Sequence, residues 1–270
     1  MPTTSTDSNI PSTFRAETVL TVQRWGARMF SFTTTRRGSF RFENGQFVML
    51  GLPIAERLIT RAYSIVSPNY DDCLEYLSIV APGGAFTPAL SRIMPGDEII
   101  IAGKPTGTLS IAGLYPGRAL YLVATGTGLA PFLSVIRDPG TYERFEKVVL
   151  AHSVRYAEDL AYKDYICGEL RGHEIVGDAV HRQFHYHPIV TRGAVRNPDR
   201  IPALIENGRL ASDNGLKPID ASRDRFMICG NPAMLTETAA VLGQRGFRAS
   251  KGIGSPGEFV YERAFAQLPP

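Results

Sequence analysis

The sequence is poor in cysteine. Its three cysteines, Cys73, Cys167 and Cys229, lie far apart, and none forms a Cys-x-x-Cys or Cys-x-x-His pair. A disulfide framework, a structural zinc site and an iron–sulfur cluster all need closer or more numerous cysteines. We therefore expect no bound metal and a reducing compartment.

Long apolar runs and a strong net charge are also missing. No stretch approaches the roughly 18 consecutive apolar residues of a membrane span. Residues 1–13 lack the basic and apolar regions of a signal peptide, so we expect a flexible arm on a cytoplasmic protein. The net charge of +3 gives no reason to expect nucleic acid as a partner. We expect a monomer that binds no membrane.

What is present is a chain of 270 residues, 44% of them hydrophobic, which is enough for two ordinary cores. Residues 14–112 contain β-branched and aromatic segments separated by turn signals, with one short helix expected at 87–93. This regular spacing predicts an antiparallel β-barrel. The predicted strands are 17–24, 28–35, 45–50, 61–66, 74–81, 97–102 and 108–112.

Residues 113–270 alternate apolar strand patterns with amphipathic helix patterns. This alternation predicts a parallel sheet covered by helices on both faces, so the expected fold is two-domain, a β-barrel followed by an α/β domain. The predicted strands are 119–125, 147–153, 184–191, 225–230 and 258–265. The predicted helices are 129–138, 157–170, 199–208 and 233–246.

Ligands of such a sheet bind beyond the carboxyl ends of its strands. Cys229, at the end of one predicted strand, either faces a nicotinamide ring, with Gly230 allowing close approach, or is simply a buried cysteine. Four segments follow predicted strands and should form one site along that edge: 125–131, 153–155, 191–192 and 229–232.

The first of these segments contains Gly126-Thr127-Gly128 between two apolar runs. Glycines there let the backbone approach a phosphate, and the following helix start offers free N–H groups. Pro131 stands where the usual dinucleotide fingerprint has a third glycine, and it fits the first turn of a helix. Because a tight strand-to-helix turn needs the same glycines for packing, this loop alone does not decide between the two readings.

Three arginines, Arg155, Arg192 and Arg200, follow two successive strands of the second half. Guanidiniums that converge on a 2′-phosphate would each contribute about 1.5–3 kcal/mol through charged hydrogen bonds. Each arginine alone reads as an ordinary surface residue. Their shared placement favours a phosphate site, and so NADP over NAD.

The barrel half has candidates of its own. Arg61 and Tyr63 fall on one face of a regular strand, and Ser64 falls on the other. A guanidinium beside a flat ring suits the pyrophosphate and ring system of a dinucleotide. Residues 83–87, a glycine pair followed by Thr87 at a helix start, suggest a second phosphate site. Two phosphate sites indicate two dinucleotides.

Seven motifs resemble, in their order and approximate spacing, those of the ferredoxin–NADP+ reductases. They are RAYS, GGAFT, GTGLAP, HSVR, VTR, CGNPAM and VYERAF, and the resemblance covers nearly all of residues 14–266. The chain is similar to bacterial members of that family. The resemblance implies FAD and NADP(H) as cofactors, NADPH as the electron donor, and an acidic ferredoxin or flavodoxin as a transient partner.

The resemblance also implies roles for individual residues. Arg61 would bind the FAD pyrophosphate, Tyr63 would stack on the isoalloxazine, and Ser64 would hydrogen-bond near its N5. The other FAD contacts would be Ala62, Leu77, Ile79, Val80, Ala85, Phe86 and Thr87. The NADP contacts would be Gly126, Thr127, Gly128, Val154, Arg155, Thr191, Arg192, Arg200, Gly230, Asn231 and Pro232. Cys229 and Glu262 would complete the nicotinamide site, which gives Tyr63, Ser64, Cys229 and Glu262 as the catalytic residues.

The tail departs from the plant-type pattern. Plant-type reductases end on a tyrosine that covers the flavin, whereas Ala264 stands at that position here and the chain continues to Pro270. In bacterial relatives Phe265 would reach the adenine of a bent FAD; plain packing of the last strand is the alternative. The departure bears on the turnover rate and not on the type of reaction.

The expected function is hydride transfer between NADP(H) and FAD, and single-electron transfer between FAD and a ferredoxin or flavodoxin. The alternatives are the reductase component of an oxygenase system and a non-enzymatic FAD-binding sensor. Five arginines and no acid lie between residues 24 and 42, either as a solvated strand face or as a docking surface for an acidic partner. They are Arg24, Arg28, Arg36, Arg37 and Arg41.

Overall fold

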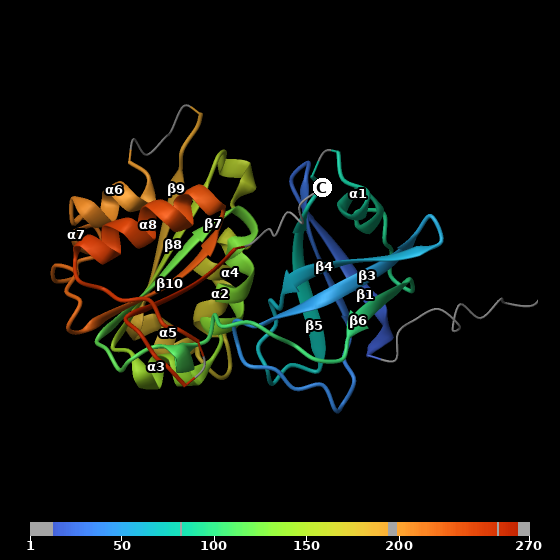
Figure 1. Cartoon of the computed structure of the whole chain (residues 1–270), viewed down its shortest axis with the longest axis horizontal. Coiled ribbons are helices and arrows are strands. Elements are labelled where there is room, and N and C mark those ends of the chain that lie inside the picture. The colour runs from blue at the N-terminus through green and yellow to red at the C-terminus, as the bar shows by residue number, and fades with distance from the viewer. Residues whose placement is uncertain (1–12, 82, 194–198, 253, 264–270) are drawn as a thin grey trace, which may run out of the picture.

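The computed structural model describes residues 13–263 except 82, 194–198 and 253. Its first half is a six-stranded antiparallel sheet in the order β4-β3-β6-β1-β2-β5 (Figure 1). A bridge between Ile65 and Tyr76 brings the chain after β4 back to β5 and so joins the two ends of the sheet. The strands are β1 (Phe14–Trp25), β2 (Met29–Thr35), β3 (Phe47–Ile54), β4 (Arg57–Ser64), β5 (Cys73–Ile79) and β6 (Glu98–Ala102).

The second half is a five-stranded sheet in the order β11-β10-β7-β8-β9, and every neighbouring pair is parallel. The chain runs from β7 through β8 to β9 on one side and then returns to place β10 on the other side of β7. The winding therefore reverses between β7 and β10, which is where such sheets bind ligands. The strands are β7 (Ala119–Thr125), β8 (Lys147–Val154), β9 (Phe184–Val190), β10 (Asp224–Gly230) and β11 (Phe259–Arg263).

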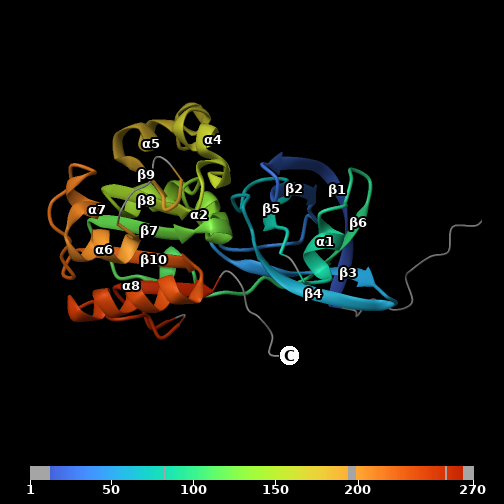
Figure 2. The same cartoon turned by 90° about the horizontal axis from the view of Figure 1, so that it is seen from above.

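Helices cover both faces of this sheet (Figure 2). One core joins Leu120 and Leu122 of β7 to the helices on one face, and another joins Tyr121 and Val123 to those on the other. The predicted fold class is therefore confirmed. On one face lie α2 (Ala130–Val135), α3 (Pro139–Arg144), α4 (Lys163–Cys167) and α5 (Gly177–Gln183). On the other face lie α6 (Ile201–Glu206), α7 (Arg209–Ser212) and α8 (Pro232–Gln244). Helix α1 (Phe86–Leu90) packs against the barrel.

Two predicted elements are wrong. Residues 108–112 are not a strand, because the N–H groups of Thr108 and Leu109 bind a carboxylate of the second domain and Ser110 caps the short helix η2 (Ile111–Gly113). The single helix predicted at 157–170 is divided into η4 (Ala157–Asp159), α4 and the start of η5 (Glu169–Gly172). Tyr162 interrupts it with a left-handed backbone, φ 59°.

Side chains join the two domains tightly. Arg137, which follows α2, is 9% exposed and donates to the carbonyl of Val66 in the barrel. The Glu75 carboxylate of β5 lies 3.6 Å from Arg137 and accepts the Tyr162 hydroxyl at 2.6 Å. The Trp25 ring lies 4.5 Å from the Tyr162 ring, centroid to centroid. These contacts hold the barrel against the α/β domain.

No helix in the described part of the chain is both long and apolar enough to cross a membrane. Nor does that part of the chain contain a group of three or more His, Cys, Asp or Glu side chains placed to hold a metal ion.

Candidate nucleotide site

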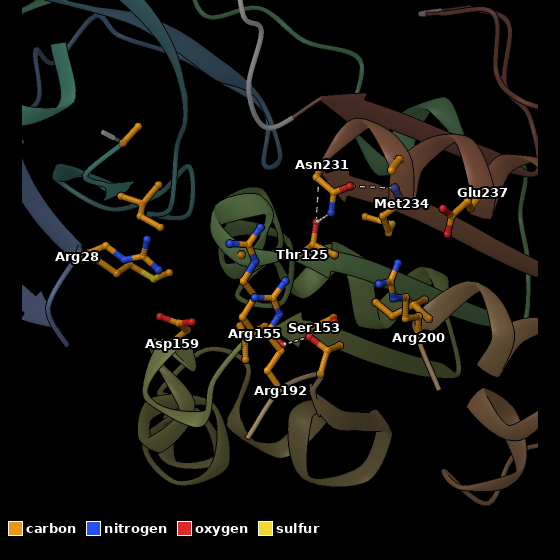
Figure 3. Close-up of a pocket in the computed structure, with 18 of the residues that line it drawn as sticks. Arg28, Thr125, Ser153, Arg155, Asp159, Arg192, Arg200, Asn231, Met234 and Glu237 are labelled. Atoms are coloured by element: carbon orange, nitrogen blue, oxygen red, sulfur yellow. Dashed lines mark hydrogen bonds between the residues drawn. The ribbon is translucent and has the colours of Figure 1, made fainter. Parts of the chain in front are cut away.

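A cleft of about 750 Å³ lies between the barrel and the carboxyl end of the parallel sheet (Figure 3). The sheet wall comes from the loops after β7, β8, β9 and β10, as the strand pattern predicts. The barrel wall comes from the β1–β2 turn and the end of β5. The lining residues used below are Arg28, Met29, Ile79, Val80, Thr125, Gly126, Ser153, Val154, Arg155, Asp159, Thr191, Arg192, Arg200, Asn231, Met234 and Glu237.

The loops after β7 and β10 are tied together at the point where the winding of the sheet reverses. The Thr125 hydroxyl oxygen accepts the backbone N–H of Asn231 at 2.9 Å and its side-chain amide at 3.2 Å. Asn231 is also the N-cap of α8, since its side-chain oxygen accepts the N–H of Met234 at 3.0 Å. Pro232 begins the helix, where its missing N–H leaves no hydrogen bond unmade. Hydrogen bonds and the helix cap therefore hold these two loops to each other.

The three glycines of these loops, Gly126, Gly128 and Gly230, are explained by different features of the structure. A Cβ at Gly128 would lie 2.3 Å from the carbonyl oxygen of Cys229, so this glycine allows the loop to pack on β10. Gly126 has φ +55° and lines the cleft, and a Cβ there would meet nothing within 4 Å. Gly230 lies against Thr125, whose hydroxyl a Cβ would meet at 2.0 Å. Of the three, only Gly126 has open space beside it that a ligand could occupy.

Arg155, Arg192 and Arg200 all line the cleft, as the sequence predicted. Backbone hydrogen bonds join two of the loops, since the N–H of Arg192 donates to the carbonyl of Arg155 at 2.8 Å. The three side chains are exposed, and none forms a salt bridge with a carboxylate in the described part of the chain. The cleft also has two acids, Asp159 and Glu237. Three cations that form no salt bridge with those acids suit a phosphate dianion.

The predicted nicotinamide residues lie where the domains meet. Glu262 of β11 stands opposite Cys229 of β10 in the sheet register. Its carboxylate accepts the backbone N–H groups of Thr108 and Leu109 and, at 3.2 Å, the Thr108 hydroxyl. Burial raises the pKa of Glu262, although these hydrogen bonds oppose the rise. Cys229 is 1% exposed, and burial raises the pKa of its thiol well above the ordinary value, so the thiol is neutral.

Strand pairing brings Ser64 close to the same place. Ser64 pairs with Phe47, and Phe47 pairs in turn with Thr106, the residue before Gly107. A Cβ at Gly107 would lie 3.0 Å from the Glu262 carboxylate and 3.1 Å from the Phe47 ring. These pairings link Ser64, through Phe47 and Gly107, to the contact with Glu262, although Ser64, Cys229 and Glu262 are not among the residues that line the cleft.

Some of the residues predicted to hold FAD, among them Arg61, Tyr63 and the 83–87 loop, do not line the cleft, whereas Ile79 and Val80 do. The Tyr63 hydroxyl is 2.9 Å from that of Ser78, its ring centroid is 6.0 Å from that of Phe86, and burial raises its pKa to about 12. Arg61 is exposed and forms no salt bridge with a described carboxylate. The adjoining loop is open at Gly83, where a Cβ would meet nothing within 4 Å. A guanidinium free of salt bridges to described carboxylates, a neutral phenol and an open glycine loop fit a flavin dinucleotide.

The other predicted residues divide into three groups. Four line the cleft: Ile79, Val80, Val154 and Thr191. Three are buried, beneath the cleft or in the barrel: Leu77, Thr127 and Phe86. Three are exposed outside the cleft: Ala62, Ala85 and Pro232. The Thr87 hydroxyl accepts the N–H of Ala81 at 3.0 Å and so closes the glycine loop. Ala264 and Phe265 lie outside the described residues.

His152 of β8 was missed from the sequence. It is fully buried, its Nε2 lies 3.3 Å from the Gly126 carbonyl oxygen, and its Nδ1 lies 3.3 Å from the Tyr186 hydroxyl. Burial lowers the pKa of His152 to about 4, so the imidazole is neutral and supports the glycine loop from below. A lone histidine in an apolar strand gave no functional signal. Arg28, Met29, Asp159, Met234 and Glu237 also line the cleft without having been predicted.

Comparison with known proteins agrees with this geometry. Residues 20–111 match the family model of the oxidoreductase FAD-binding domain, and residues 122–240 match that of the oxidoreductase NAD-binding domain. A ferredoxin–NADP reductase of Pseudomonas aeruginosa is 50% identical over 256 residues, which is 95% of this chain and 99% of the relative. The chain belongs to the ferredoxin–NADP reductase family.

Other members of this reductase family show the same relationship at lower identity. A flavodoxin/ferredoxin–NADP reductase of Escherichia coli is 33% identical over 82% of this chain and 86% of its own. The crystal structure of a ferredoxin NADP+ reductase from Neisseria gonorrhoeae with bound FAD and NADP matches with a TM-score of 0.85 and 32% identity, covering 94% of this chain and all of that one. The predicted family, two-domain fold and FAD and NADP cofactors are confirmed for this reductase.

Proposed function

We propose that the protein transfers hydride between NADP(H) and FAD, and single electrons between FAD and a ferredoxin or flavodoxin. In this proposal residues 14–112 are the FAD-binding unit and residues 113–270 the NADP-binding unit. FAD, when bound, supplies the capacity to take up two electrons together and to release them singly. The observation that carries the proposal is the cleft at the carboxyl end of the sheet. Its three arginines form no salt bridge in the described part of the chain, and the same sheet places Cys229 and Glu262 beside the barrel.

Each group of residues has a separate task. The guanidiniums of Arg155, Arg192 and Arg200 bind the 2′-phosphate and so orient the nucleotide. The hydrogen-bonded Thr125–Asn231 floor holds its middle. The neutral thiol of Cys229 and the anchored carboxylate of Glu262 border the nicotinamide, where burial keeps water away.

On the barrel side, Arg61 holds the FAD pyrophosphate. The phenol of Tyr63, which burial keeps neutral at physiological pH, presents a flat ring to the isoalloxazine. Ser64 places a hydroxyl at the junction with the nicotinamide site. Thr87 keeps the glycine loop in shape for the phosphates.

The five arginines between residues 24 and 42 do not form one surface. Arg36 donates to the carbonyls of Phe40, Asn69 and Asp71 and holds two loops together, while Arg28 faces the cleft. Arg24, Arg37 and Arg41 remain exposed, and we propose them as the docking edge for an acidic carrier. We also propose that the protein acts as a cytoplasmic monomer, since a transient carrier needs free access to that edge.

The decisive experiment is anaerobic stopped-flow absorbance of the purified flavoprotein mixed with NADPH or with NADH. Much faster bleaching of the flavin by NADPH supports hydride transfer with 2′-phosphate recognition. A flavin reduced by neither nucleotide would instead support a non-enzymatic sensor. Adding ferredoxin, flavodoxin or an oxygenase component to the reduced protein then tests the acceptor, and reoxidation only by the oxygenase component would favour the alternative enzyme.

A further inference from the structure

The cleft has a fourth arginine that comes from the barrel. Arg28 lies in the turn between β1 and β2, and its side chain points into the cleft from the wall opposite Arg155 and Arg192 (Figure 3). The three other cleft arginines all come from loops of the parallel sheet. A nucleotide bound along that sheet therefore also faces a positive charge on the barrel side of the cleft.

The turn that carries Arg28 is fixed to both domains. The Arg28 carbonyl accepts the N–H of Val80 at 2.8 Å, which pins the turn to the end of β5. Trp25, at the start of the turn, packs on Tyr162 of the sheet domain. A Cβ at Gly26 would lie 3.4 Å from the carbonyl oxygen of Glu158, so the turn also touches η4. The position of Arg28 is thus set by the domain interface.

The Arg28 guanidinium has no partner of its own among the described residues. It is exposed, and neither a salt bridge nor a side-chain hydrogen bond of this guanidinium occurs there. Asp159 lines the same cleft but accepts the N–H of Tyr156 in its own turn. By contrast, Arg24 donates to the carbonyl of Ser91 and lies over the Phe30 ring. Arg28 is therefore available to an anionic ligand.

We propose that Arg28 binds the diphosphate that joins the two halves of the nicotinamide nucleotide. This inference rests on the proposed function. If the 2′-phosphate lies at the three-arginine end and the nicotinamide lies beside Cys229, the diphosphate has to cross the middle of the cleft. Gly126 meets it on the sheet wall, and Arg28 meets it on the barrel wall. Because NADP and NAD share this diphosphate, Arg28 contributes affinity for both without discriminating between them.

The test compares three ligands on three variants of the FAD-loaded protein, with dissociation constants measured by difference absorbance or calorimetry. The ligands are NADP+, NAD+ and adenosine 2′-monophosphate, which carries the 2′-phosphate without the diphosphate. The variants are Arg28→Ala, Arg192→Ala and Arg92→Ala; Arg92 is an exposed barrel arginine outside the cleft and controls for loss of one charge.

Arg28→Ala is expected to weaken NADP+ and NAD+ by a similar factor, about tenfold for one charged contact at an exposed site, and to leave adenosine 2′-monophosphate unchanged. Arg28→Lys, measured as a fourth variant, should recover part of the loss. Arg92→Ala should change none of the three. The FAD content, read from the ratio of flavin to protein absorbance, should be the same in all variants.

Three results would overturn the proposal: unchanged NADP+ binding in Arg28→Ala, weakened binding of adenosine 2′-monophosphate, or a loss of FAD, which would assign Arg28 to the flavin. Failure of the proposed function gives a different pattern. In that case Arg192→Ala would fail to weaken NADP+ and adenosine 2′-monophosphate selectively over NAD+.

Discussion

Two glycines lie in the loop after β7, and replacing each by alanine should have a different effect. Gly128→Ala should lower mainly the stability of the protein, and Gly126→Ala mainly its affinity for nucleotide. At Gly128 a Cβ would lie 2.3 Å from the Cys229 carbonyl oxygen and 2.9 Å from the Gly230 Cα, both backbone atoms that cannot rotate away. We expect Gly128→Ala to cost about 3 kcal/mol, the upper end for overpacking, because β10 or the loop has to move.

Gly126→Ala should behave differently. Its φ of +55° costs an alanine about 1 kcal/mol, but the Cβ would meet no protein atom within 4 Å. Instead it would project into the space proposed for the nucleotide diphosphate. We therefore expect a small loss of stability and a loss of NADP+ affinity of about tenfold or more.

Thermal unfolding followed by circular dichroism and NADP+ titration followed by difference absorbance measure the two effects. For a chain of this size, about 3 kcal/mol corresponds to a fall in Tm of roughly 6–12 °C. A Gly128→Ala protein with unchanged Tm and weakened nucleotide binding would refute the packing assignment. Normal NADP+ binding by Gly126→Ala would show that its open side does not face the ligand.

Three further substitutions test other parts of the site. Arg192→Ala should raise the KM for NADPH about tenfold and leave that for NADH nearly unchanged; equal effects in steady-state assays would contradict a 2′-phosphate role. Glu262→Gln should stabilise the protein more at pH 8 than at pH 5 in urea unfolding. The reason is that burial raises the folded-state pKa of Glu262, so wild-type stability falls as pH rises through that pKa; a gain confined to pH 5 would contradict this. Arg137→Met should cost about 3 kcal/mol in urea unfolding, because the carbonyl of Val66 and the carboxylate of Glu75 lose their partner; a cost near zero would show that the interface does not depend on it.

The sequence predicted the edge of the sheet where ligands bind because that prediction depends only on the alternation of strand and helix. Parallel strands place their carboxyl ends together whatever the details of the loops, which is why Arg155, Arg192 and Arg200 were expected at one edge and why all three line the cleft. The role of Gly128 could not be decided in the same way. A glycine needed for packing and a glycine needed for a phosphate look the same in sequence, and only the distance to Cys229 distinguishes them.

The contacts between the two domains could not be predicted from the sequence, because they join residues that lie far apart in the chain. Residues 108–112 have a strand-like pattern, but their N–H groups bind Glu262, which lies more than 150 residues away in the chain. Arg28 carried no pattern that separates it from the four arginines near it in sequence. Its place in the cleft depends on how the β1–β2 turn docks against Tyr162 and Glu158, which is a property of the assembled fold.

The loops that carry the three sheet arginines have a consequence for how coenzyme preference can evolve. Arg155 and Arg192 each follow a different strand, and Arg200 precedes α6, so every one of them is a loop residue whose side chain supports no core packing. Cys229 and Glu262, in contrast, lie within neighbouring strands that the core holds in register. Under the roles proposed for these residues, we expect mutations at the loops to exchange one coenzyme for the other while the electron-transfer chemistry stays intact, so that the two traits are open to separate selection.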